Sequence, residues 1–153
     1  MNKLKTLFVT YGGAHYRIFN ILGKNFDNVS IMDARFKKDF EKHLGHISAG
    51  SMKFSKSKIH LFNSVLKNSK NVDIVIANCP ISGALTYFAS FFNRKKRVFL
   101  MCQDFYEYFD VSEKNLLKRI IFGNILKFFI RLSVRKSHVI ALSNHIKKRA
   151  RAY

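Results

Sequence analysis

The sequence predicts a parallel, doubly wound α/β fold. Short apolar segments of strand length alternate with segments of helical periodicity along the whole chain. Several of these short segments are almost free of polar residues, as expected of strands that are covered on both faces. The chain also opens with a strand, a glycine turn, a helix and a second strand within about thirty residues, which is the pattern of a βαβ unit. This order of elements is typical of a parallel sheet with helices on its faces.

The first unit begins with a predicted strand over Leu4–Thr10, which is rich in strand-forming residues and ends at the turn signal Tyr11-Gly12-Gly13. Apolar residues then recur at helical spacing over Ala14–Leu22, and we expect Gly23 to stop that helix. Val29–Met32 is the second predicted strand. These four pieces make up the opening βαβ unit.

The middle of the chain has the weakest pattern. Residues 34–58 are polar and basic, so we expect mostly loop there, with one short helix near Phe36–Leu44. Apolar residues recur at helical spacing over Ile59–Leu66. Asp73–Ala77 is apolar after its first residue and is the third predicted strand.

The rest of the chain continues the alternation with two strands and three helices. We predict the strands over Arg97–Cys102 and His138–Leu142, and the helices over Ile81–Phe92, Glu113–Arg135 and Asn144–Tyr153. Ser143 precedes the last helix and is a favourable N-cap residue. Five strands result, in one domain that covers residues 1–153, because no linker, repeat or low-complexity segment divides the chain.

The segment Glu113–Arg135 is apolar nearly all round, and four basic residues interrupt it before its end. We expect a helix that is mostly buried in the domain. The alternative is a helix that lies on an anionic membrane, with its basic side chains extended to the headgroups. Phe91-Phe92, followed by the basic stretch Arg94–Arg97, is a second candidate for such membrane contact.

The balance of charge is the unusual feature of the composition. The chain has 28 Lys and Arg residues against 9 Asp and Glu, which gives a formal net charge of +19. A field of this sign favours nucleic acid, anionic lipid headgroups or phosphorylated substrates, and charge alone does not choose among them. No zinc finger, RNP-like run or clear helix-turn-helix is present. A basic nucleic-acid-binding α/β module is therefore the alternative function, with binding that depends steeply on salt.

Cysteine and histidine spacing gives no sign of a metal site. Cys79 and Cys102 lie in apolar runs, so we interpret them as core thiols in a reducing compartment. His43 and His46 are three residues apart, but no second pair accompanies them, as a zinc site would require. We expect no metal ion and no cofactor. We expect a cytoplasmic protein, with peripheral contact at the inner face of the cell membrane as an open alternative.

One stretch without charged residues, Ile74–Asn93, is long enough to suggest a membrane-spanning helix. Asn78, Pro80, Ser82 and Gly83 interrupt its first half. A strand, a turn and a helix fit this interruption better than one spanning helix, so we expect no transmembrane segment.

Polar residues follow each predicted strand. In a parallel sheet these positions share the carboxyl edge, where ligands of doubly wound folds bind. Asp33, Cys79 and Pro80 are among them, and so are the candidate substrate-binding residues, which are Gly12, Gly13, Asn78, Gln103, Asp104 and Ser143. The sequence therefore predicts one cleft along this edge.

Two of these positions suggest particular chemistry. Gly12-Gly13 allows the backbone to approach an anion at a helix N-terminus, although the third glycine of a dinucleotide fingerprint is absent and a simple tight turn is an equal alternative. His15 lies in the first turn of that helix, where the helix dipole favours a neutral imidazole that can exchange a proton with a ligand. We select His15 as a candidate catalytic residue.

Asp104 is the second candidate catalytic residue. An apolar strand delivers its carboxylate to the edge, next to the aromatic residues of the segment Phe105–Phe109. Aromatic rings stack on sugar faces while a carboxylate binds hydroxyls, so this combination suits carbohydrate or lipid recognition. In the alternative interpretation Asp104 caps a turn and the aromatic residues belong to the core.

These segments together resemble the N-terminal domain of GT-B glycosyltransferases, especially the large retaining family called group 1 or family 4. The resemblance covers essentially the whole chain. Its pieces are the opening strand with Gly12-Gly13, the strand that ends at Asn78, the helix that contains Gly83, the strand that ends before Gln103-Asp104, and the segment from Ser137 to Asn144 with the basic helix after it. The last piece is the most specific, because in the family it leads towards the donor-binding domain.

The resemblance implies a Rossmann-like half of a GT-B fold. It places Gly12 and Gly13 near the donor phosphates and the Gln103-Asp104 loop near the acceptor. Family members often have a His-Asp-like pair after the fourth strand, and Gln103 stands here in place of the histidine. The family's donor-binding domain, with its E-x7-E pattern, would follow Tyr153, so we expect either a truncated chain or one that pairs with a donor-binding partner subunit.

The implied function is the acceptor-binding half of a glycosyltransferase. Such an enzyme moves a sugar from a nucleotide donor to a glycan or lipid-linked acceptor in surface-polysaccharide synthesis, and we expect no transfer without the donor-binding half. A different small α/β nucleotide-sugar enzyme is a further alternative. A response-regulator-like receiver is disfavoured, because residues 1–26 contain no acidic residue.

Overall fold

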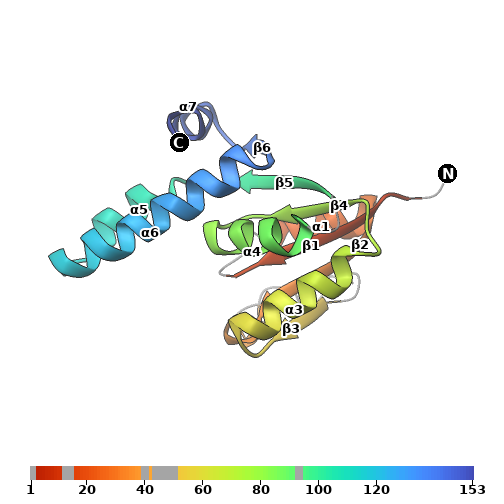
Figure 1. Ribbon diagram of the computed structural model, residues 1–153. Helices are drawn as coiled ribbons and strands as arrows, with labels where there is room; N and C mark the ends of the chain where they lie inside the picture. Colours follow the sequence, from red (N-terminus) through yellow and green to blue (C-terminus); the bar gives the residue numbers. More distant parts are fainter. Residues whose placement is uncertain (1–2, 12–15, 39–41, 43–51, 92–94) are drawn as a thin grey trace.

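A six-stranded sheet forms the centre of the computed structural model, which describes residues 3–11, 16–38, 42, 52–91 and 95–153 (Figure 1). All neighbouring strands pair in parallel, in the order β3-β2-β1-β4-β5-β6. This is the strand order of a doubly wound, Rossmann-like sheet, so the predicted fold class is confirmed. The strands are β1 (Lys5–Thr10), β2 (Asp27–Asp33), β3 (Met52–Ser55), β4 (Ile74–Ala77), β5 (Lys96–Met101) and β6 (His138–Ala141).

Helices cover both faces of the sheet. Connections that lead from β1 towards β3 run in one direction and those that lead from β3 to β6 run in the other, so right-handed crossovers put their helices on opposite faces. In Figure 1, α3, α4 and α6 lie in front of the sheet and α1 lies behind it. The helices are α1 (Tyr16–Asn25), α3 (Lys58–Ser69), α4 (Pro80–Phe91), α5 (Phe105–Ser112), α6 (Leu116–Arg135) and α7 (Asn144–Ala152), and Ala34–Phe36 forms a short 3₁₀ turn.

The central strand β1 divides the core into two layers. Leu7 and Val9 point to the side of α3 and α4, where they pack in a cluster with Leu61 and Val65. Phe8, between them in the sequence, points to the opposite side and packs in a cluster with Leu22 of α1. All three β1 side chains have no exposed surface. Full burial on both faces explains why three apolar residues follow one another in the middle of this strand.

Most of the predicted elements are confirmed within one to three residues. The stretch Ile74–Asn93 divides into β4 and α4, and no helix among the described residues is long and apolar enough to cross a membrane. Ser143 is the N-cap of α7, since its side chain accepts a hydrogen bond of 3.2 Å from the backbone N–H of Ile146.

Two predictions in the first half of the chain are wrong. Gly23 does not stop α1, because the helix continues to Asn25 and the N–H of Phe26 still bonds to the carbonyl of Leu22 at 2.9 Å. Packing of Leu22 against the sheet outweighs the poor helix propensity of glycine. The stretch interpreted as mostly loop also contains β3, a sixth strand at the edge of the sheet that pairs with β2.

The predicted helix Glu113–Arg135 differs in two ways. The chain forms a separate helix α5 before it, and α6 begins only at Leu116, where the side chain of Asn115 accepts a hydrogen bond from the N–H of Lys118 at 3.0 Å. The expectation of a mostly buried helix is wrong, since only three residues of α6 are buried, namely Gly123, Ile130 and Ser133.

Candidate functional site

The point where the strand order reverses lies between β1 and β4. These strands are neighbours in the sheet, but their following helices α1 and α4 lie on opposite faces (Figure 1), and ligands of doubly wound folds bind at such a point. The chain leaves β1 at Tyr11 and leaves β4 at Asn78 and Cys79. Gly12, Gly13 and His15, which were predicted for this place, lie outside the described residues.

At this point the side-chain oxygen of Asn78 is a buried acceptor for which no described residue supplies a donor. The residue is 4% exposed, and its side-chain oxygen Oδ1 is buried without a hydrogen-bond partner among the described residues. A buried acceptor without a donor costs about 1–3 kcal/mol of stability. The sheet edge therefore holds an acceptor that a ligand hydroxyl or N–H can satisfy, directly before the N-terminus of α4.

The residues after Asn78 form a closed turn. The N–H of Cys79 donates to Oγ of Ser82 at 3.2 Å, and that hydroxyl donates to the Cys79 carbonyl at 3.0 Å. Burial raises the pKa of the Cys79 thiol, against the opposing effect of hydrogen bonds from Ser82. Burial also raises the pKa of Cys102 to about 11. Both free thiols stay protonated at neutral pH, which disfavours a role as nucleophile.

A charged cluster lies at the ends of β1 and β2. Asp33, which is 3% exposed, accepts hydrogen bonds from the backbone N–H of Arg35 at 2.9 Å and from its Nε at 3.0 Å. The guanidinium also donates to the hydroxyl of Tyr11 and lies 5.0 Å from the centre of that ring. Burial by itself would raise the pKa of Asp33, but the hydrogen bonds and charge of Arg35 outweigh it and hold the pKa below its usual value.

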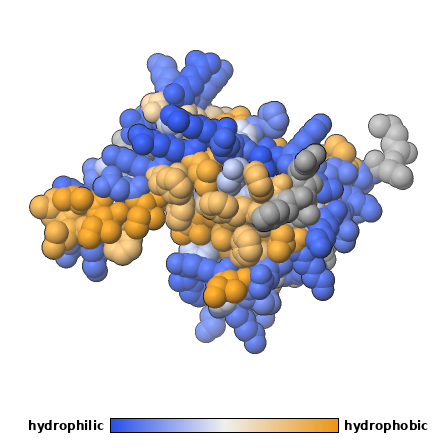
Figure 2. Space-filling model, in the orientation of Figure 1, coloured by the Kyte–Doolittle hydropathy of each residue, from blue (hydrophilic) through white to orange (hydrophobic). Residues whose placement is uncertain are grey.

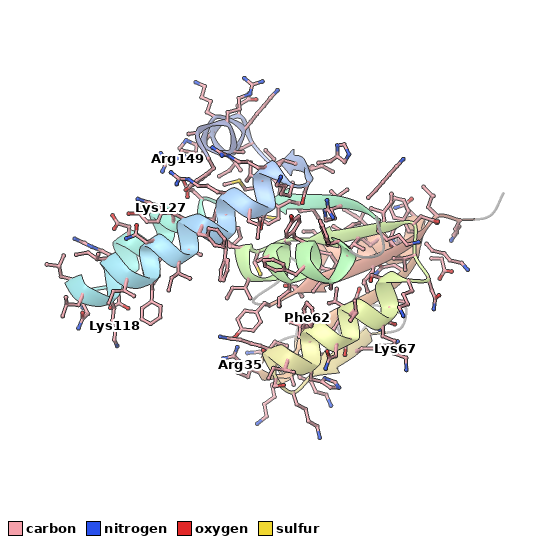
Figure 3. The ribbon with its side chains drawn as sticks, in the orientation of Figure 1. Arg35, Phe62, Lys67, Lys118, Lys127 and Arg149 are labelled. Carbon is pink, nitrogen blue, oxygen red and sulfur yellow. The ribbon has the colours of Figure 1, made fainter. Side chains whose placement is uncertain are left out.

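This cluster presents positive charge to solvent. The side chain of Arg35 is 64% exposed (Figure 3), whereas Asp33 is ionised and buried. The ammonium of Lys58 lies 5.7 Å from the centre of the Tyr11 ring. Sequence reasoning placed Asp33 at this edge and did not single out Tyr11 or Arg35. The spacing of Asp33 and Arg35, two residues apart at a strand end, was the available signal.

Asp104 lies at the end of β5 and is enclosed by the protein. Its Oδ1 accepts hydrogen bonds from the hydroxyl of Tyr153 at 2.8 Å and from the N–H of Tyr106 at 3.1 Å, and its Oδ2 accepts one from Nε of Arg149. Its side chain is 3% exposed. The carboxylate therefore starts α5 and fixes α7 to the sheet, and the structure uses its main acceptor positions internally.

The two remaining predicted residues lie at the same edge. Gln103, next to Asp104, is exposed to solvent, and the predicted aromatic segment after it forms α5. Ser143 follows β6 and uses its side chain to cap α7. Sequence reasoning did not find Arg149 and Tyr153, because they meet Asp104 from 45 and 49 residues further along the chain.

The described residues contain no group of three or more His, Cys, Asp or Glu side chains that could hold a metal ion. The sheet edge offers a ligand the hydrogen-bonding groups of Asn78 and Gln103 and the positive charge of Arg35. Such an arrangement suits the recognition of hydroxyls and anionic groups.

Comparisons with solved structures define the class of fold. No protein-family model matches the sequence, and no curated protein matches it. The chain is similar in structure to a protein assigned as a UDP-N-acetylglucosamine 2-epimerase from Listeria monocytogenes, with a TM-score of 0.64 and 12% identity over 99% of this chain and 42% of that one. The UDP-GlcNAc 2-epimerase of Methanocaldococcus jannaschii gives a TM-score of 0.60 and 13% identity, over 97% of this chain and 42% of that one.

A third similar structure is HepE of Anabaena in complex with UDP. It gives a TM-score of 0.57 and 17% identity, over 96% of this chain and 40% of that one. The chain thus spans about two fifths of the length of each of these proteins. At such low identity the likeness establishes the fold alone, and that fold is the Rossmann-like half of a GT-B structure.

Proposed function

We propose that this chain is the acceptor-binding half of a glycosyltransferase that moves a sugar from a nucleotide donor to a glycan or lipid-linked acceptor in surface-polysaccharide synthesis. The observation that carries the proposal is the buried side-chain oxygen of Asn78 at the switch point of the sheet, which has no hydrogen-bond partner in the part of the chain that the structure describes. A sugar hydroxyl can donate a hydrogen bond to such an oxygen. The fold supports the proposal, since similar structures include one with bound UDP and two that are named for a UDP-sugar substrate.

The parts of the edge have distinct roles in this proposal. Asn78 accepts a hydrogen bond from an acceptor hydroxyl, and Gly12 and Gly13 let backbone amides approach the donor phosphates. His15 takes the proton that the acceptor hydroxyl loses, and Ser143 lines the β6 end of the same edge. Gln103 meets the sugar acceptor with its exposed carboxamide. Asp104 approaches the acceptor from the same loop, and its carboxylate also accepts hydrogen bonds from the protein.

The donor side is proposed to come from a second half. A donor-binding domain or a partner subunit would hold the nucleotide, and the positive charge of Arg35 and Lys58 would help to balance its pyrophosphate. The chain works at the cytoplasmic face of the membrane in this proposal, where a lipid-linked acceptor is available. Transfer by the chain alone is not expected.

Acceptor binding by two matched variants tests the proposal. Asn78 and Asn28 are both buried asparagines, 4% and 5% exposed, but Asn28 lies at the start of β2, at the opposite edge of the sheet. Calorimetric titration with a panel of oligosaccharides should give binding that Asn78→Ala weakens about tenfold, equal to about 1.4 kcal/mol. Asn28→Ala should leave the affinity unchanged.

Equal affinities in the two variants, or no binding by any oligosaccharide of the panel, would refute the proposal that the sugar acceptor binds at the carboxyl edge of the sheet. Titration with RNA and DNA belongs to the same experiment. Tight, sequence-selective binding that persists at raised salt would favour a nucleic-acid-binding module instead, because purely electrostatic binding declines steeply with salt.

A further inference from the structure

An apolar arm extends from the domain. It consists of α5 and the first thirteen residues of α6, Leu116–Phe128, and it reaches beyond the sheet at the left of Figure 1. Figure 2 shows this arm as a mostly hydrophobic surface with hydrophilic residues at its margins. Its exposed large apolar residues are Leu116, Leu117, Ile120, Ile121, Phe122, Ile125 and Phe128, each between 45% and 71% exposed. Contiguous exposed apolar surface of this kind is a sign of an interaction site.

The exposed residues include a stripe along one side of α6. At 100° per residue, Leu117, Ile121 and Phe128 lie within about 40° of one another around the helix. They are 71%, 57% and 57% exposed. Helix α4 packs against α6, while its exposed Phe88 and Phe91 line a separate cavity together with Phe62 of α3. The stripe points away from Ile130, which is buried, and from Gly123, which packs against Tyr106 of α5.

Basic residues border the stripe. Helix α6 contains two lysines and three arginines and no acidic residue. Lys118 and Lys127 are nine residues apart, so they lie on opposite sides of the helix, as Figure 3 shows. The stripe passes between them. The ammonium of Lys127 also lies 4.0 Å from the centre of the Tyr106 ring in α5, so this cation lies against the arm itself.

The charge and the shape of the stripe indicate which kind of partner binds it. A second copy of the chain would bring two surfaces of net charge +19 together, which electrostatic repulsion opposes. A nucleic acid would match the cations and leave the apolar stripe in water. An anionic bilayer matches both, because acyl chains receive the apolar side chains while lysine and arginine reach the headgroups.

We propose that the arm inserts its stripe into the interface of an anionic lipid bilayer and holds the sheet edge at the membrane surface. The inference deepens the proposed function and rests on it for its purpose, since a lipid-linked acceptor lies in that interface. The physical claim is independent of any acceptor, because the exposed stripe and its basic border need only phospholipid. The helix lies on the bilayer and does not cross it.

A pair of matched variants tests the arm. Ile121 on α6 and Ile21 on α1 are both 57% exposed, and they lie on opposite faces of the sheet. Ile121→Glu and Ile21→Glu change the net charge equally. The full chain is sedimented with vesicles of pure phosphatidylcholine and with vesicles that contain phosphatidylglycerol in addition. We expect at least tenfold tighter binding to the anionic vesicles, at least a tenfold loss in Ile121→Glu, and less than a twofold change in Ile21→Glu.

Fluorescence locates the inserted side chain. The chain has no tryptophan, so a single introduced tryptophan reports without background. Phe128→Trp should show a blue-shifted emission with anionic vesicles and quenching by lipids with brominated acyl chains. Ile140→Trp, on β6 at the α1 side of the sheet and 49% exposed before substitution, should show neither.

Several outcomes overturn the proposal. Equal losses in the two glutamate variants would mean that general charge attraction holds the protein, and equal signals from the two tryptophans would mean that no face is preferred. Dimers that Ile121→Glu dissociates, without vesicle binding, would assign the stripe to a second copy of the chain. These vesicles carry no glycan or nucleotide, so failure here is distinguishable from failure of the acceptor-binding experiment.

Discussion

The hydroxyl of Tyr153 donates a hydrogen bond of 2.8 Å to Oδ1 of Asp104, a residue 49 positions earlier in the chain. Nε of Arg149 donates to the other carboxylate oxygen. One buried carboxylate at the end of β5 thus holds both the middle and the end of the last helical segment. Asp104, which the sequence suggested as a catalytic residue, thus stabilises the fold by holding α7. Stability measurements can separate this structural role from a catalytic one.

We predict that Asp104→Asn lowers the free energy of unfolding by about 1–3 kcal/mol, because it weakens hydrogen bonds to a buried acceptor whose partner Arg149 is charged. Urea unfolding measures the change. Asp110→Asn is the control, since Asp110 pairs with Arg119 at 3.5 Å on a surface where both side chains are more than 40% exposed, and such pairs contribute little. A stable Asp104→Asn protein that has lost acceptor binding would instead assign Asp104 to the reaction.

Tyr153 should make the stability depend on alkaline pH. Burial, together with the hydrogen bond to Asp104, raises its pKa in the folded protein above the unfolded value of about 10. The folded state therefore keeps a proton that the unfolded chain releases, and the stabilisation is complete below pH 10 and declines as the pH rises beyond it. Unfolding is measured between pH 8 and 11, roughly the range that brackets the unfolded pKa of about 10. The free energy of unfolding of the native protein should begin to decline in the upper part of this range.

Tyr153→Phe removes the ionising hydroxyl and is the matched variant. It should be less stable at neutral pH, because Asp104 loses a donor, and it should lose less stability than the native protein between neutral and alkaline pH. Parallel curves for the two proteins would contradict the assignment of this linkage to Tyr153.

The helices pack more closely at Gly83 than at Gly123. A Cβ added at Gly83 in α4 would lie 2.7 Å from Cβ of Ser133 in α6, whereas one at Gly123 would come no closer than 3.3 Å to Cε2 of Tyr106. Both positions are helical, so alanine has the same propensity advantage at each. We expect Gly83→Ala to destabilise the fold by about 1–3 kcal/mol through overpacking. Gly123→Ala should stay within about 1 kcal/mol of the native value, and equal thermal midpoints for the two variants would contradict this.

The fold was predictable where burial leaves a pattern. β1 and β4 are apolar on both faces, and their sequences show it without ambiguity. β3 lies at the edge of the sheet with Lys53 exposed in its middle, so its four residues resemble the basic loop around them. The apolar composition of α6 predicted a helix but not its exposure, since hydrophobicity does not reveal whether a partner surface is present.

The sequence predicted where the residues of the candidate site lie in the fold. The carboxyl ends of the strands meet at one edge in any parallel sheet, which is why Asn78 and Gln103-Asp104 could be placed there from their spacing alone. The state of each side chain was not predictable. Whether Asn78 has a partner, or Asp104 has three, depends on residues far away in the sequence and on the packing of α7.

The buried side-chain oxygen of Asn78 allows a last prediction, which concerns the free energy of unfolding of the protein without ligand. Asn28 accepts a hydrogen bond from the hydroxyl of Thr6 at 2.9 Å and donates one to Ser30 at 2.7 Å, and all three residues are buried. Asn28→Ala leaves these two partners unsatisfied and should cost about 1–3 kcal/mol in urea unfolding. Asn78→Ala removes an acceptor that has no partner among the described residues, so the free energy of unfolding should fall by less or should rise. A larger loss in Asn78→Ala than in Asn28→Ala would mean that Asn78 is part of the structural network, and that the sheet edge does not keep an acceptor in reserve for a ligand.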